Sequence, residues 1–261
     1  MKSIRKPAFA GHFYSRNPGE LSATVAALLE GAQDQDTPAP KALIVPHAGY
    51  HYSGPVAASA YARLRPYRDQ YRRVILVGPC HRTPIHGLAL SSADMYRTPM
   101  GDVPVDRAAI ASLDIPNVRV SDKSHRTEHS LEVHLPFLLA VLGKFSIVPI
   151  VVGGATPELV SEVLDALWGG PETLIVISSD LSHFLQYDDA RLIDAVTCEA
   201  IENLDAGRIS RQMACGATPV RGLLIAARRH QMEVTTLDLR NSADTAGARG
   251  PVVGYGAWAF V

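Results

Sequence analysis

Histidines follow the ends of three apolar runs that have the composition of buried strands. His47 ends "ALIVPH", His81 ends "VILVGPCH" and His183 ends "LIVISSDLSH". Functional sites in open α/β sheets are built at the carboxyl ends of the strands. Neutral imidazole is the commonest metal ligand, so two such side chains at equivalent strand ends favour a shared metal ion. The spacing therefore predicts one crevice that holds all three histidines, although each of them alone is more typical of an ordinary loop residue.

The third of these runs continues as "SSDLSHF", which brings Ser, Asp and His together within a short stretch. The chain has no G-x-S-x-G nucleophile elbow, and catalytic triads are spatial rather than sequential arrangements, so serine-hydrolase chemistry is disfavoured. We expect His183 to act as a general acid or base facing a metal-bound ligand. Asp180 is near enough in sequence to influence the protonation of His183.

The chain has three cysteines with scattered spacing, which argues against a disulfide framework and for reduced thiols. Cys215 directly precedes a glycine and a helix expected to begin near Thr218. A thiol near a helix N-terminus is biased toward the thiolate, the form that binds metals or attacks electrophiles. Cys80, beside His81, is either a core residue or a second thiol in the same pocket. Cys198 is most simply a small core residue.

The stretch "SHRTEHSLEVHLPFL" contains further histidines and carboxylates. His125 and His129 have the i, i+4 spacing that places two ligands on one helical face, but no Glu follows the first His, which disfavours a metalloprotease. A polar loop that caps a helix starting near Ser130 is the simpler alternative. An intermediate alternative is that these side chains hydrogen-bond to the metal ligands. The candidates for orienting ligands or binding substrate are Tyr50, Cys80, His125, Glu128, His129 and Glu132.

Short apolar runs alternate with amphipathic stretches along most of the chain. Runs rich in Val and Ile that are bounded by Gly or Pro are typical of strands buried on both faces of an α/β sheet. The last two runs, 232–239 and 252–260, resemble antiparallel or edge additions. We therefore predict an α/β fold with a central, mostly parallel or mixed sheet flanked by helices. Buried strands are expected at 42–46, 73–78, 145–153 and 173–179, and helices at 54–65, 157–168 and 189–205.

An additional helix is predicted near the N-terminus. Asn17 is a good cap, Pro18 suits the first turn, and Glu20 completes a pattern like a capping box, so the helix should run to about Glu30. The polar segment 31–40 that follows is the weakest point in the organisation of the chain.

The composition describes an ordinary globular chain: 261 residues, 47% hydrophobic and 20% charged. A formal net charge of −1 provides no basic field for nucleic acid or an anionic membrane, so neither is an expected partner. No apolar run reaches the roughly 18 residues of a membrane span, and the N-terminus lacks a signal-peptide pattern. We expect a cytoplasmic protein.

Taken together, these stretches resemble the Memo family, whose bacterial and archaeal members are often labelled AmmeMemoRadiSam system protein B. The resemblance covers almost the whole chain, which implies one domain over residues 1–261. It is carried by motifs in the family's order: "KPAFAGHFYSRNPGEL", "PHAGYHYSG", "VILVGPCH", "YRTPMGDVPVD", "HRTEHSLEVHLPFL", "VPIVVG", "SSDLSHF", "CGATPV" and "VVGYGAWAF".

The resemblance implies a fold similar to class III extradiol dioxygenases, which use non-haem iron. It maps a two-histidine, one-cysteine metal site onto His47, His81 and Cys215, and places His183 where those enzymes have their acid/base histidine. A thiolate in place of a carboxylate shifts the preference toward copper, zinc or thiolate-tolerant iron. Iron or copper is thus the expected cofactor, with zinc as an alternative, and extradiol cleavage itself is not carried over.

One position departs from the family: Cys80 stands where serine is usual. A thiol there could alter the choice of metal or form a transient disulfide with Cys215. Three functions stay open for the chain as a whole. The first is a metal-dependent redox enzyme acting on an unknown substrate, and the second a non-catalytic protein that binds a peptide or metabolite in the same crevice. The third is an accessory role beside radical SAM and AMMECR-type proteins.

Overall fold

The structure is a computed structural model that describes residues 2–32 and 38–261. Half of the expected weak point at 31–40, residues 33–37, lies outside the described residues. Among the helices in the described ranges, none combines the length and apolar character that crossing a membrane requires.

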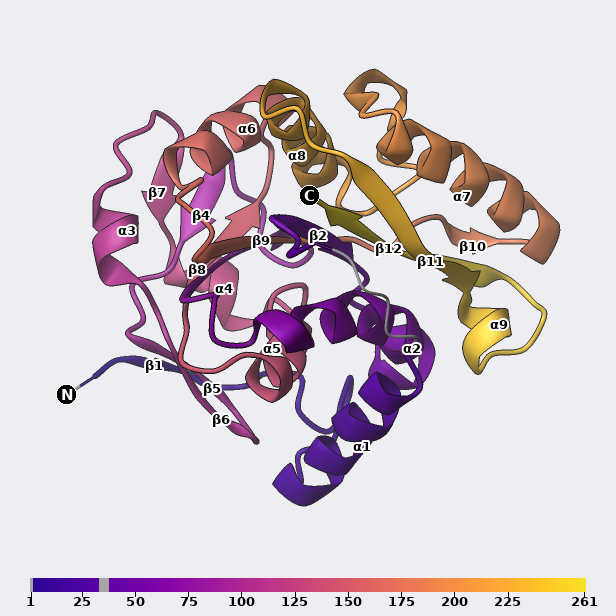
Figure 1. Cartoon of the computed structure of the whole chain (residues 1–261), viewed down its shortest axis with the longest axis horizontal. Coiled ribbons are helices and arrows are strands. Elements are labelled where there is room, and N and C mark those ends of the chain that lie inside the picture. The colour runs from indigo at the N-terminus through magenta and orange to yellow at the C-terminus, as the bar shows by residue number, and fades with distance from the viewer. Residues whose placement is uncertain (1, 33–37) are drawn as a thin grey trace.

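A large mixed sheet forms the centre of the fold (Figure 1). Its strand order is β10-β12-β2-β9-β3-β8-β4-β7, and β11 pairs with β12. The central strands β2, β9, β3 and β8 are parallel, whereas β12 and β4 run antiparallel to their neighbours β2 and β8. The strands span β2 (Ala42–Val45), β3 (Arg73–Pro79), β4 (Leu88–Leu90), β7 (Val118–Val120), β8 (Ser146–Val152), β9 (Thr173–Ser178), β10 (His183–Leu185), β11 (Val234–Asn241) and β12 (Val252–Phe260).

Helices cover both faces of this sheet, which explains why its central strands are apolar along most of their length. In Figure 1 the sheet is seen nearly edge-on, with α6, α7 and α8 on one side and α1, α2 and α5 on the other. The helices are α1 (Pro18–Glu30), α2 (Tyr50–Tyr61), α3 (Arg107–Ala111), α4 (Asp122–Arg126), α5 (Leu135–Val141), α6 (Pro157–Ala166), α7 (Tyr187–Glu202), α8 (Ala217–Arg229) and α9 (Ser242–Thr245), with short 3-10 turns at Ala62–Tyr67, Glu132–His134 and Ala206–Arg208.

A second, three-stranded sheet lies beside the N-terminus and was not predicted. Its order is β1-β5-β6, from β1 (Ile4–Arg5), β5 (Met95–Thr98) and β6 (Gly101–Pro104). The buried side chain of Arg5 leaves this sheet and forms an ion pair with Glu132, which is also buried. The N-terminal segment is thereby fixed to the body of the protein.

The predicted fold class is confirmed, and so are the buried strands and the antiparallel position of the last two strands. Helix α1 begins as predicted, because the side chain of Asn17 accepts hydrogen bonds from the backbone N–H groups of Gly19 and Glu20 at 2.9 and 3.2 Å. The reciprocal half of the capping box is absent, since Glu20 accepts from the hydroxyl of Ser15 instead. Helix α2 begins earlier than expected, at Tyr50, whose N–H donates to the carbonyl of Phe13 at 2.8 Å.

Candidate metal centre

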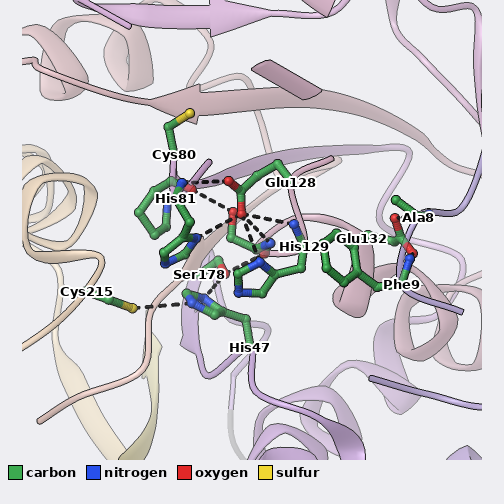
Figure 2. A network of polar contacts seen from close by, with 12 residues as sticks. Ala8, Phe9, His47, Cys80, His81, Glu128, His129, Glu132, Ser178 and Cys215 are labelled. Atoms are coloured by element: carbon green, nitrogen blue, oxygen red, sulfur yellow. Dashed lines mark hydrogen bonds and ion pairs between the residues drawn. The ribbon is translucent and has the colours of Figure 1, made fainter. Parts of the chain in front are cut away.

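Three histidines from separate segments meet at one end of the central sheet (Figure 2). His47 follows β2, His81 follows β3, and His129 comes from the loop between α4 and the 3-10 turn Glu132–His134. One nitrogen from each ring lies within 4.8 Å of one from each of the others. The strands β2 and β3 are parallel and are separated only by β9, so their carboxyl ends open onto the same edge. The residues that the structure describes therefore include a group that can hold a metal ion.

The ring of His47 is held in one tautomer. Its Nδ1 lies 2.6 Å from the hydroxyl oxygen of Ser178, and that hydroxyl donates its only hydrogen to the carbonyl of Ser130 at 2.6 Å. Nδ1 must therefore carry the hydrogen and donate to Ser178, which leaves a lone pair on Nε2. Complete burial lowers the pKa of His47 well below its usual value, and neighbouring histidines lower it further. His47 is thus a neutral imidazole, the form that binds metals.

Glu128 orients the ring of His81. Its side chain is buried, and Oε1 accepts the Nδ1–H of His81 at 2.9 Å while Oε2 accepts the backbone N–H of the same residue at 2.7 Å. Oε1 also accepts the backbone N–H groups of His129 and Ser130, both at 3.0 Å. Burial alone would raise the pKa of Glu128, but the hydrogen bonds and the charge interaction with His81 outweigh it and hold the pKa at about 2. An ionised carboxylate that fixes a histidine ring is the usual support of a metal-binding imidazole.

His129 is the third member of the cluster, and its ring packs against that of His81 with centroids 4.5 Å apart. On its other side it contacts Phe13, with a centroid distance of 4.8 Å. Nδ1 of His129 is buried and has no hydrogen-bond partner among the described residues, although it lies 3.3 Å from Oε1 of Glu128. Burial lowers the pKa of His129 to about 4, so the ring is neutral near pH 7. An unpartnered buried nitrogen in such a ring fits a metal ligand.

Cys215 lies next to one ring of this cluster. Its Sγ is 3.3 Å from Nε2 of His47, the nitrogen with the free lone pair. The close approach depends on Gly216, because a Cβ there would come within 2.6 Å of both the carbonyl of Ser178 and the side chain of Ser179. Burial raises the pKa of the Cys215 thiol, so the expected bias toward the thiolate is wrong in the metal-free protein. As a metal ligand, Cys215 would have to release its proton when the ion binds.

Asp180 supports the loop that carries His47. Its buried carboxylate accepts the backbone N–H of His47 at 2.7 Å, and its second oxygen lies 4.0 Å from Nε2 of that residue. Burial raises the pKa of Asp180 to about 6 although the hydrogen bond from His47 opposes this. His183 is exposed, and its Nδ1 donates to the carbonyl of Leu181 at 2.8 Å. The Nε2 of His183 is thereby left with a lone pair for a proton.

Two further candidates, Cys80 and Tyr50, each donate a hydrogen bond to a backbone carbonyl. Cys80 donates to the carbonyl of Thr83 at 2.8 Å, and its sulfur points away from the three rings in Figure 2. The Tyr50 hydroxyl donates to the carbonyl of Val133 at 2.6 Å.

Glu132 anchors the N-terminal segment rather than the cluster. It accepts the backbone N–H groups of Ala8 and Phe9 at 2.9 and 2.8 Å, and the hydroxyl of Tyr14 at 2.5 Å.

His125 and His129 do not share a helical face, because α4 ends at Arg126. Both ring nitrogens of His125 are engaged, one with the hydroxyl of Tyr96 at 2.8 Å and the other with the carbonyl of Ala89 at 3.0 Å. The two residues therefore separate into one structural histidine and one member of the cluster. Sequence reasoning did not distinguish them, and it missed Ser178, whose only signal was its place at the end of the β9 run.

Comparisons with known proteins agree over almost the whole chain. The profile of the Memo family, described as Memo-like protein, matches residues 5–259. A MEMO1 family protein of Aquifex aeolicus is 35% identical over 97% of this chain and 97% of its own length. The Protein MEMO1 of Xenopus laevis is 32% identical over 98% of this chain and 97% of its own length.

Among solved structures, an uncharacterized protein from Escherichia coli K12 is similar with a TM-score of 0.53. The similarity covers 84% of this chain and 98% of that chain at 13% sequence identity. At this level of identity the likeness shows a shared fold and nothing more.

Proposed function

The chain belongs to the Memo family, and from this premise we propose that it is a metal-dependent redox enzyme acting on a small substrate. The observation that carries the proposal is the cluster of His47, His81 and His129, whose ring nitrogens lie within 4.8 Å of one another. Burial keeps the rings of His47 and His129 neutral. Hydrogen bonds through Nδ1 fix the rings of His47 and His81. Such preparation of imidazoles is the pattern of metal-binding sites.

Cys215 is proposed as a further ligand, because its sulfur already contacts the Nε2 of His47. Imidazole nitrogens suit iron, copper and zinc, whereas a thiolate favours copper or zinc and tolerates iron. We propose iron or copper as the resident ion, with zinc as the alternative. When bound, such an ion supplies the Lewis acidity and, for iron or copper, the electron transfer that a redox reaction needs.

The protein's own part in the reaction is proton transfer and positioning. His183 is proposed as the acid or base, since the hydrogen bond of Nδ1 to the carbonyl of Leu181 leaves Nε2 free to accept a proton. Asp180 fixes the loop of His47 through a backbone hydrogen bond, and the charge interaction with His183 lowers the pKa of Asp180.

Metal analysis of protein purified without oxygen tests this proposal. Wild type should carry one ion per chain, and His47→Ala should lose it. His230→Ala is the matched control, because His230 is a partly exposed histidine at the end of α8, paired with Asp165 and remote from the cluster in the chain. Absence of a stoichiometric ion from wild type, or its retention by His47→Ala, would refute the metal site.

A second candidate is a non-catalytic protein that binds a peptide or metabolite in the same crevice. Exposed aromatic side chains favour it, since Phe184, next to His183, is 75% exposed and Tyr52 is 43% exposed. Exposed aromatic rings are frequent anchors for ligands. This candidate predicts ligand binding that survives both Cys215→Ser and His81→Ala, and loss of binding in both variants would exclude it.

An accessory role beside radical SAM and AMMECR-type proteins is compatible with either candidate. Mixing the purified proteins and measuring complex formation by sedimentation tests this role. The absence of a complex would contradict a role that depends on direct binding.

A further inference from the structure

A cavity of about 320 Å³ is bordered by Cys215, whose sulfur contacts His47 of the cluster. Its walls come from the segments that follow β3 and β8 and from the start of α8. Both Cys80 and Cys215 border the cavity. Cys80 directly precedes His81 in the sequence, and the sulfur of Cys215 contacts His47. Its volume is at the lower end of the range of small-molecule sites, about 300 to 1,000 Å³.

The lining combines carbon surface with polar groups, among them the side chains of Thr83 and Thr218, and one cation. Pro79, Ile85, Val152 and Pro219 provide carbon surface. Of the described residues that border the cavity, Arg211 alone carries a charge. Within the described ranges its guanidinium is in none of the ion pairs, whereas the neighbouring Arg208 is paired with Glu199 at 3.3 Å. A guanidinium that has no carboxylate partner among the described residues is available to one from a ligand.

We propose that this cavity is the carboxylate-binding part of the substrate site, and that Arg211 binds the carboxylate of a small organic acid. That the bound acid is a substrate rests on the proposed function, but binding of the acid does not require the metal. A guanidinium binds a carboxylate through two parallel hydrogen bonds. One cation matches the single charge of a carboxylate, whereas the described residues of the lining offer no second cation for the second charge of a phosphate dianion. The apolar walls suit the carbon skeleton of the acid.

Binding of benzoate to the metal-free chain tests the proposal, because no metal can then capture the carboxylate. Titration calorimetry should show saturable binding of benzoate to wild type and none of its neutral analogue benzamide. Arg211→Gln should weaken benzoate binding by about tenfold or more, since hydrogen bonds to charged groups contribute about 1.5–3 kcal/mol. Arg208→Gln is the matched control and should bind as wild type does.

The cysteines locate the bound acid within the chain. Benzoate should slow the alkylation of Cys80 and Cys215, which border the cavity. Cys198 is the internal control, because its thiol contacts Thr236 on β11 instead. Equal protection of all three thiols would place the ligand elsewhere and overturn the proposal.

Other results would also overturn it: no saturable binding of benzoate, equal binding of benzamide, equal binding by Arg211→Gln, or tighter binding of inorganic phosphate. The metal content of Arg211→Gln, measured in parallel, should equal that of wild type. A wild type that binds benzoate but carries no metal would refute the proposed redox function and leave the acid site standing, so the two failures are distinguishable.

Discussion

Replacing Glu128 by glutamine should weaken both the fold and metal binding. The carboxylate accepts four hydrogen bonds through its two oxygens, two of them from His81. An amide has one oxygen, so its NH₂ group must face at least one of these donors. The pKa of Glu128 falls from 4.5 to about 2. At about 1.4 kcal/mol for each pH unit, the site stabilises the charged carboxylate by about 3 kcal/mol.

We therefore expect Glu128→Gln to lower the free energy of unfolding of the metal-free protein by about 3 kcal/mol near pH 7, measured by urea denaturation. Metal affinity should fall by roughly 10- to 100-fold, the usual effect of removing the partner of a ligating histidine, measured by competition with a chelator. Glu162→Gln, an exposed change on α6, should alter neither quantity. Wild-type metal affinity in folded Glu128→Gln would refute the reasoning that this carboxylate prepares His81.

Two further predictions concern the support of the site. Burial lowers the pKa of His125 to about 4, so the unfolded chain takes up a proton that the folded protein excludes, and stability should be lost as the pH falls from about 6.5 to about 4. The loss of stability from this residue is about 3 kcal/mol. Urea denaturation at pH 7 and pH 4.5 should show that the free energy of unfolding declines less in His125→Gln than in wild type. An equal decline in the two proteins would contradict this prediction. Gly216→Ala should destabilise the fold by about 1–3 kcal/mol, because the new Cβ would meet the carbonyl of Ser178 and the side chain of Ser179. An unchanged thermal midpoint would show that residue 216 has room for a methyl group.

The sequence predicted the central sheet because its strands are long apolar runs with no competing helical period. It also predicted that His47 and His81 follow strands, since each ends such a run. The order β2-β9-β3, which brings the two ends together, depends on crossovers between segments far apart in the chain and is not written in any local pattern. The strands β1, β4, β5, β6 and β7 have two to four residues each, too few for a periodic signal.

The site itself was predicted only in part, for physical reasons that particular residues show. His125 and His129 look alike in sequence, but the end of α4 at Arg126 turns one toward Tyr96 and the other toward the cluster. The protonation of Cys215 was misjudged because proximity to a helix start suggested a thiolate, whereas burial dominates. Burial depends on the packing of the whole fold, which local sequence does not specify.

X-ray absorption spectroscopy of the metal-loaded protein tests the three-histidine site, because it counts the ligands of the bound ion. We expect scattering from three imidazole rings in wild type and from two in His129→Gln, with a sulfur contribution that disappears in Cys215→Ser. An ion that shows the same number of imidazole rings in wild type and His129→Gln would contradict the cluster of His47, His81 and His129.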